Sequence, residues 1–242
     1  MTQQIERTLK ALKANRFGAQ FAPSAAAARA LILDMIPQNA SVGIGDSVTL
    51  RQIGMLEALI KRGNNVINPF TLELTIGMSE DPAKHRLFKE TTRKTFGTDV
   101  FLTGSNAVTE DGKIVNIDRA GNRVAGIIYG ADVVILVIGR NKIVKDADEA
   151  VKRIKGVIAP AHAGWKKSRT PCAAGSECTD CASVDRMCNI TVILEKRPIN
   201  TDVNVILIDE DLGLGWDPDW DEKRVRAIES NYRKNTWSFK KE

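Results

Sequence analysis

Hydrophobic residues recur near the N-terminus at the spacing of an amphipathic helix. Ile5, Leu9 and Leu12 fall on one helical face, and Ser24 can cap the alanine-rich run that follows it and stops before a proline. We therefore expect residues 1–37 to form a helical N-terminal extension.

From residue 41 onward, short apolar runs alternate with helical patterns. The longest uninterrupted apolar run, Val133 to Ile138, is typical of a central strand buried on both faces. Turn residues around Gly112 and Gly121 predict that residues 113–117 and 124–129 form a hairpin. The other expected strands are 41–44, 66–67, 100–102, 190–195 and 203–208, and the expected helices are 50–61, 81–96, 146–154 and 219–232.

Strands that alternate with helices predict an α/β fold, a Rossmann-like mixed sheet flanked by helices. The hairpin is what makes the expected sheet mixed rather than parallel throughout. We expect residues 38–215 to form this domain, and residues 216–242 to form a C-terminal helix and a basic tail.

The composition is that of a globular protein. Of the 242 residues, 43% are apolar and 27% are charged, which excludes the disordered and low-complexity classes. No apolar run approaches the length of a bilayer crossing, and the first ten residues lack the apolar core of a signal peptide. We therefore expect a cytoplasmic protein with no membrane insertion.

The net charge of +5 raises the question of a nucleic-acid partner. The excess is local, because residues 151–171 hold six basic residues and no acidic one. Neither this run nor the basic C-terminal end interleaves aromatic residues in a base-stacking pattern, which disfavours nucleic-acid binding.

All four cysteines lie close together, in the pattern Cys172-x5-Cys178-x2-Cys181-x6-Cys188. A Cys-x2-Cys pair can place two thiolates on one metal, and two flanking cysteines complete four ligands. The set fits an iron–sulfur cluster or tetrahedral zinc, and spacing does not separate the two. The preceding basic run would offset the charge of an anionic cluster.

The loop after the expected strand 41–44 is a candidate anion site. Its candidate residues are Gly43, Gly45, Asp46, Ser47 and Thr49. Glycines let backbone N–H groups approach a ligand, but the same residues also suit a capped structural turn. No NAD fingerprint is present, because valine follows Ser47 where glycine or alanine is needed.

Further polar residues follow two other strands, at the edge where open α/β sheets bind ligands. Arg123 could hold a carboxylate, and Lys142 follows a glycine turn after the longest apolar run. His162, ten residues before the first cysteine, and Glu110 are the candidate proton acceptors. The remaining candidates for substrate binding are Asn106, Asn122 and Asn141.

Four stretches together resemble the lactate-utilisation (LUD) domain family: VGIGDSVTLRQIGMLEAL, TGSNAVTEDGKIVNIDRAGNRVAGIIYG, VVILVIGRNKIV and TPCAAGSECTDCASVDRMCNI. The resemblance covers about residues 20–215 and includes the glycine loop, the Asn-x2-Thr-Glu-x-Gly stretch, the Gly-x-Asn-Lys stretch and the four cysteines. It implies a fold similar to the sugar-phosphate isomerase and CoA-transferase group.

The resemblance also implies a function in the NAD-independent oxidation of L-lactate, or a related 2-hydroxy acid, to its oxo acid. A 4Fe-4S cluster on the cysteines would transfer electrons to an iron–sulfur or flavin partner protein, and a homo-oligomer is compatible with the sequence. Two alternatives stay open: a ligand-binding or assembly module with structural zinc, and a non-redox CoA- or phosphate-type transferase. Unlike larger family members, the chain is not expected to carry a separate ferredoxin-like domain.

Overall fold

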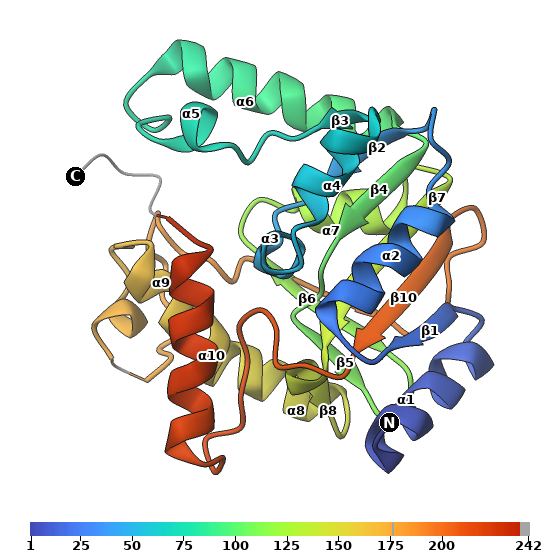
Figure 1. Cartoon of the computed structure of the whole chain (residues 1–242). Coiled ribbons are helices and arrows are strands. Elements are labelled where there is room, and N and C mark those ends of the chain that lie inside the picture. The colour runs from blue at the N-terminus through green and yellow to red at the C-terminus, as the bar shows by residue number, and fades with distance from the viewer. Residues whose placement is uncertain (176, 238–242) are drawn as a thin grey trace.

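The computed structural model describes residues 1–175 and 177–237, in which the strands form two sheets. Figure 1 shows the larger sheet at the centre, with α2 and α4 in front of it and the last helix, α10, standing to one side. The α/β fold predicted from the sequence, a Rossmann-like sheet flanked by helices, is confirmed.

The larger sheet has six strands within the described residues, and every neighbouring pair in it is parallel. The predicted apolar run forms β7 (Val133–Gly139), which lies between β10 and β4 and is buried along nearly its whole length. The other strands are β1 (Gly18–Ala22), β10 (Asp202–Ile208), β4 (Val100–Thr103), β2 (Ser41–Ile44) and β3 (Asn65–Ile67).

The smaller sheet has the order β8-β5-β6-β9 and holds the antiparallel pairs, so the mixed pairing is confined to it. Its strands are β8 (Ile143–Val144), β5 (Ala107–Thr109), β6 (Ile114–Asp118) and β9 (Ile190–Leu194). β6 pairs with β5 and β9, not with residues 124–129.

The predicted strand at 124–129 was therefore wrong, because these residues form helix α7 (Asn122–Ile128). The Asp118 carboxylate accepts a hydrogen bond from the backbone N–H of Val124 at 3.1 Å, which satisfies a donor in the first turn. A Cβ on Gly126 would lie 2.6 Å from the ring of Phe101. The helix thus packs directly on the larger sheet, and this contact outweighs the β-branched composition.

The N-terminal segment is helical as predicted, but it also contains a strand. Helices α1 (Gln3–Ala14) and α2 (Ala25–Met35) flank β1, which pairs with β10 along the edge of the larger sheet. Ser24 caps α2 by accepting a hydrogen bond from the backbone N–H of Ala27.

Helices cover both faces of the larger sheet. The expected helix 50–61 is two helices, α3 (Val48–Gln52) and α4 (Met55–Arg62), separated by Gly54 with φ of 64°. α2, α3 and α4 pack on one face, and α1 and α7 pack on the other. The remaining helices are α5 (Leu72–Thr75), α6 (Pro82–Lys94), α8 (Ala147–Arg153), α9 (Ala159–Trp165) and α10 (Glu222–Lys234).

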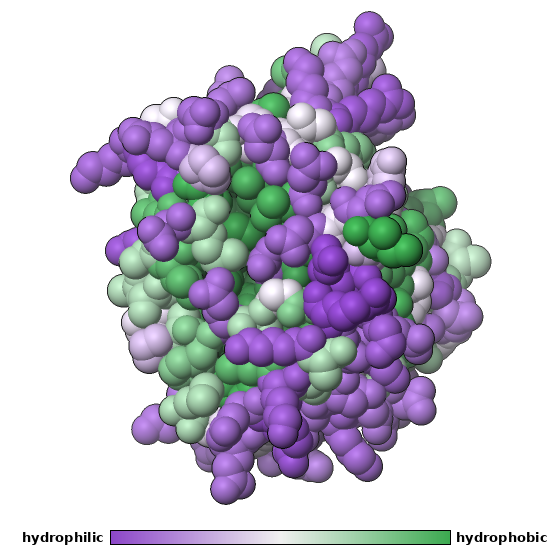
Figure 2. Space-filling view, turned by 90° about the vertical axis from the view of Figure 1, so that its right-hand side faces the viewer, coloured by the Kyte–Doolittle hydropathy of each residue, from purple (hydrophilic) through white to green (hydrophobic). Residues whose placement is uncertain are grey.

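Hydrophilic residues cover much of the surface, and hydrophobic residues gather in patches between them on the face that Figure 2 shows. Helix α1 illustrates this division, because Ile5, Leu9 and Leu12 are buried while the residues between them are mostly polar. In the described part of the chain, no helix combines the length and the apolar character needed to cross a bilayer.

Candidate functional site

A cavity of about 680 Å³ opens at the carboxyl ends of the parallel strands. Residues that follow β2, β4, β7 and β10 form its floor, where open α/β sheets bind ligands. Its other walls come from β6 and α7, from α9 and α10, and from the region of α5 and α6. The cavity therefore joins segments far apart in the chain, in the size range of small-molecule sites.

Lys142 lies on the floor of the cavity and is 7% exposed. Its Nζ donates hydrogen bonds to the carbonyl of Ser105 at 2.9 Å and to Oγ1 of Thr49 at 3.5 Å. Burial, and to a lesser extent the positive charge of Arg123, lower the pKa of Lys142 to about 7.

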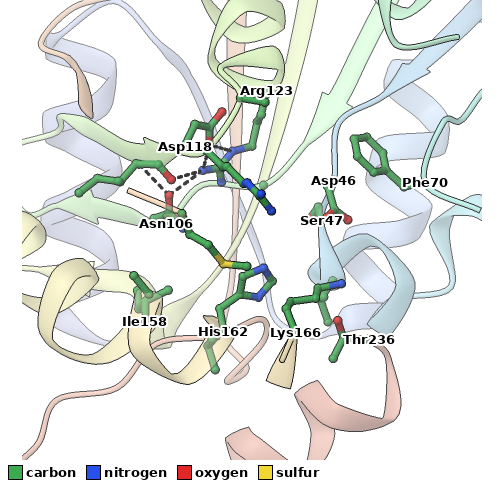
Figure 3. Close-up of a pocket in the computed structure, with 18 of the residues that line it drawn as sticks. Asp46, Ser47, Phe70, Asn106, Asp118, Arg123, Ile158, His162, Lys166 and Thr236 are labelled. Atoms are coloured by element: carbon green, nitrogen blue, oxygen red, sulfur yellow. Dashed lines mark hydrogen bonds and ion pairs between the residues drawn. The ribbon is translucent and has the colours of Figure 1, made fainter. Parts of the chain in front are cut away.

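Arg123 lies in the wall between β6 and α7 and is already held by protein groups (Figure 3). Its Nε donates to Asp118 at 2.9 Å, and its Nη2 donates to Asn106 Oδ1 at 2.7 Å and to the carbonyl of Ile117 at 3.2 Å. Asp118 is 8% exposed, so this is a buried ion pair. Arg123 is thus positioned by the cavity wall and compensated by a carboxylate.

A second charged group lies at the opposite side of the cavity, where Figure 3 places Asp46 and Lys166. Asp46 accepts a hydrogen bond from Arg51 at 2.9 Å. Burial opposes ionisation of Asp46, but the charges of Arg51, Lys166 and His162 outweigh it and lower the pKa of this carboxyl. Burial lowers the pKa of Lys166 to about 8, although Asp46 acts in the opposite direction.

His162 points from α9 toward the middle of the cavity (Figure 3). Its Nδ1 is 2.7 Å from the hydroxyl of Tyr232 on α10. Burial and the charge of Lys166 lower the pKa of His162 to about 4, against the opposing effect of Asp46. The imidazole is therefore neutral at pH 7 and can accept a proton.

The rest of the lining is largely apolar. Phe70 and Phe88, from the region of α5 and α6, meet edge to face with ring centroids 5.6 Å apart. Ile154, Ile158 and Leu214 line the cavity from the side of α9. A ligand in this cavity would meet charged groups on the floor and hydrophobic side chains around them.

The structure brings most of the predicted site residues to this one cavity. Those that line it are Asp46, Ser47, Thr49, Asn106, Asn122, Arg123, Lys142 and His162. These residues come from segments that follow three different strands and from helices α3, α7 and α9, and the strand-end pattern predicted the first group.

Four predicted residues lie elsewhere. Gly43 and Gly45 pack against neighbouring backbone and side chains, since a Cβ at either would come within 2.6 Å of another atom. Asn141 is fully buried and bonds to Gly215 and to the backbone N–H of Leu212. Glu110 faces a different part of the surface, where it pairs with Arg7, so the structure does not bring it to His162.

The segment that carries the four cysteines, from Cys172 to Cys188 and called the cysteine loop below, adjoins the cavity. Its residues Asp185 and Met187 help to line the cavity. Asp185 forms ion pairs with Arg169 at 3.0 Å and with Arg119 at 3.5 Å, which tie the loop to the turn before α7. Cys178 is exposed, and the other three cysteines are partly buried.

The chemistry of four thiols suits iron or zinc, but their placement does not fit a metal as it stands. In residues 1–175 and 177–237, no three His, Cys, Asp or Glu side chains come together as a metal site requires.

Three residues of the site, Asp118, Lys166 and Tyr232, are not among the candidates that the sequence predicts. Tyr232 belongs to an amphipathic helix and reads there as an ordinary core residue. Asp118 reads as a turn residue. Lys166 belongs to the acid-free run 151–171, which the sequence connects only with the cysteines; a run of bases without acids was the signal that could have found it.

Comparison of the chain with known proteins gives one similar solved structure and one matching protein family. The crystal structure of a DUF162 family protein from Deinococcus radiodurans is similar, with 13% sequence identity and a TM-score of 0.48, over 85% of this chain and 96% of that one. No curated protein matches the chain. The LUD domain family matches residues 5–208, most of the chain. The protein therefore belongs to the lactate-utilisation (LUD) domain family.

Proposed function

We propose that the cavity binds a small 2-hydroxy or 2-oxo carboxylate of the lactate and pyruvate type. The observation that carries this proposal is Lys142, a buried amine at the cavity floor. Among the residues that the structure describes, no carboxylate forms an ion pair with it, and the charge that acts on its pKa is the like charge of Arg123. A buried cation without a counterion favours an anionic ligand.

The other charges around the cavity support the same ligand class. Arg123 is paired with Asp118, Arg51 is paired with Asp46, and their charges offset one another. The positive charge of protonated Lys142 is therefore not neutralised by either of these pairs. A carboxylate beside it would gain a charge-assisted hydrogen bond, which is stronger than a neutral one.

His162 supplies the acid–base group for a 2-hydroxy acid. A neutral imidazole can take the hydroxyl proton when the hydroxyl carbon is oxidised to a ketone. The carbon-bound hydrogen leaves with its electron pair as a hydride in the same oxidation, and we propose that the flavin of a separate partner protein accepts it, from which an iron–sulfur protein can take the electrons one at a time. This chain then supplies substrate binding and proton transfer within an L-lactate-oxidising system.

The volume of the cavity favours a second candidate function. About 680 Å³ exceeds what a three-carbon acid requires, and aromatic residues line the part near α5 and α6. A larger anion with an apolar body, such as a CoA thioester, would fill more of this space. This candidate is a non-redox transferase that uses the same basic floor.

Calorimetry with L-lactate, pyruvate and acetyl-CoA tests both candidates. We expect lactate and pyruvate to bind, and Lys142→Met to weaken binding at least about tenfold through loss of a charged hydrogen bond. Lys145→Met is the matched control, since Lys145 is exposed and lies three residues along the chain, outside the cavity lining. Binding of acetyl-CoA alone would select the transferase, and equal affinity of both variants would contradict the role of Lys142.

A further inference from the structure

Lys142 differs from the other amine at the cavity in its surroundings. Its Nζ donates to a backbone carbonyl and lies near a threonine hydroxyl, and both are neutral groups. Lys166 instead lies within the influence of the Asp46 carboxylate and donates a hydrogen bond to the carbonyl of Trp237. Of these two lysines, Lys142 is the one whose protonated form has no stabilising carboxylate nearby.

The backbone around Lys142 fixes this amine in place. The preceding Asn141 accepts a hydrogen bond from the backbone N–H of Leu212 at 2.9 Å and donates one to the carbonyl of Gly215 at 2.9 Å. Between them, Gly213 approaches so closely that a Cβ there would lie 2.6 Å from Nζ of Lys142. The loop 212–215 therefore packs against the amine and limits the directions in which it can move.

These features are typical of a nucleophilic lysine. A lysine becomes a nucleophile when burial or a nearby cation destabilises its protonated form. Both causes act on Lys142, and they lower its pKa to about 7, so that much of the amine is neutral near physiological pH. The same cavity contains a proton acceptor, His162, and the hydroxyl group of Tyr232.

We propose that Lys142 forms a covalent imine with a 2-oxo carboxylate bound in the cavity. The neutral Nζ attacks the ketone carbon, a C–N bond forms, and the carbonyl oxygen leaves as water with two protons. Nothing is oxidised or reduced in this step. The inference rests on the proposed function in one respect, that the cavity binds a carboxylate. A 2-hydroxy acid has no ketone, so it meets the amine only as a hydrogen-bond and charge partner.

An imine would also change the chemistry at the neighbouring carbon. A protonated imine withdraws electrons and makes hydrogens on the adjacent carbon acidic, and a base in the cavity can then exchange them with solvent. For pyruvate these are the methyl hydrogens, so imine formation predicts enzyme-dependent exchange of methyl hydrogen for deuterium in D2O.

Reductive trapping tests the proposal directly. The full chain is incubated with pyruvate and cyanoborohydride, which converts an imine into a stable N-carboxyethyl lysine, and peptide mapping by mass spectrometry locates the modified residue. We expect the modification on Lys142, at least about tenfold less total modification in Lys142→Arg, and unchanged modification in Lys145→Arg. Modification should persist on Lys142 in Lys166→Arg.

The outcomes separate this inference from the proposed function. If lactate and pyruvate bind but Lys142 is not modified and no methyl exchange occurs, the inference is overturned and the proposed carboxylate site stands. If Lys142 is modified by pyruvate while lactate does not bind, the inference stands and the proposed part in lactate oxidation fails. Modification spread over exposed lysines to the level of Lys142 also overturns the inference. Mapping the wild-type chain keeps the test valid even where a Lys142 variant does not fold.

Discussion

The hydroxyl of Tyr232 lies 2.7 Å from Nδ1 of His162, so that one hydrogen bond joins the last helix to the helix that precedes the cysteine loop. The two rings meet at 75°, with centroids 6.2 Å apart. This contact fixes the orientation of an imidazole whose pKa is lowered to about 4. Protonation of this buried imidazole should therefore destabilise the folded protein in acid.

We expect stability to fall as the pH decreases from about 6.5 to about 4. The unfolded chain binds a proton at the ordinary histidine pKa of 6.5, whereas folded His162 resists protonation until about pH 4. Acidification across this window therefore favours unfolding, by about 1–2 kcal/mol for a group that keeps some contact with solvent. Thermal unfolding of the wild type and of His162→Gln should show a flatter pH dependence in the variant. Parallel curves would assign the acid sensitivity to other groups.

The affinity for L-lactate should fall as the pH rises above about 7. A bound carboxylate favours protonated Lys142, so binding takes up a proton once the free amine has lost it near that pH. Calorimetry from pH 6 to pH 9 measures this directly, and Lys142→Arg, which stays charged, should remove much of the dependence. An affinity that rises with pH in the wild type would contradict this role for the amine.

The close approach of Gly213 to Lys142 predicts a specific cost for adding one methyl group. Gly213 has φ of 70°, and a Cβ there would lie 2.6 Å from Nζ of Lys142 and 2.7 Å from Oγ1 of Thr49. Gly63 is a matched control, because its φ is 90° and nothing lies within 4 Å of a Cβ. Denaturant unfolding should show a loss of about 1 kcal/mol for Gly63→Ala from backbone strain and a clearly larger loss for Gly213→Ala. Equal losses of unfolding free energy in the two variants would mean that the loop 212–215 can move away from Lys142 without destabilising the protein.

The buried pair of Arg123 and Asp118 should contribute far more to stability than an exposed pair. Asp118→Asn leaves a buried guanidinium without its carboxylate and should lower the free energy of unfolding by about 3 kcal/mol. Glu222→Gln removes the partner of Arg226 in an exposed pair and should change little. Chemical denaturation compares the two variants, and similar small effects in both would show that water compensates Arg123.

The cysteine loop remains a proposed metal site. We expect anaerobically purified protein to contain iron and sulfide, and Cys181→Ser to lose them, because four thiols in seventeen residues suit a 4Fe-4S cluster. Zinc without sulfide would select the structural alternative. Since the described thiols do not converge, binding would require the loop to rearrange, and metal should then protect it from proteolysis. Absence of both metals, or unchanged metal in Cys181→Ser, would reject the four-cysteine assignment.

Much of the fold could be predicted because the buried positions of a helix or strand are apolar and recur at a regular spacing in the sequence. The run that forms β7 is apolar throughout, since helices cover both faces of the sheet there. β1 was missed because its short segment contains glycine, alanine and glutamine, and its pairing with β10 joins residues 186 positions apart. α7 was misread because β-branched residues also suit a helix once Asp118 and Phe101 hold it in place.

The location of the candidate site was predictable, but its internal chemistry was only partly so. Parallel strands end at one edge, and this alone gathers Asp46, Asn106 and Lys142. Glu110 also follows a strand, but that strand belongs to the smaller sheet, where it meets Arg7 of the first helix. The contact between Tyr232 and His162 depends on how α10 packs against α9, which no local spacing encodes.

The last described residues of the chain are part of the cavity wall. Trp237 donates a hydrogen bond from its indole to Thr75 at 2.9 Å, and the guanidinium of Arg51 lies over its ring at 4.3 Å from the centroid. Thr236 faces the cavity itself. Truncation of the chain before Thr236 would therefore remove part of the cavity wall together with both contacts of the Trp237 indole. Binding measurements thus require a chain in which Thr236 and Trp237 are kept.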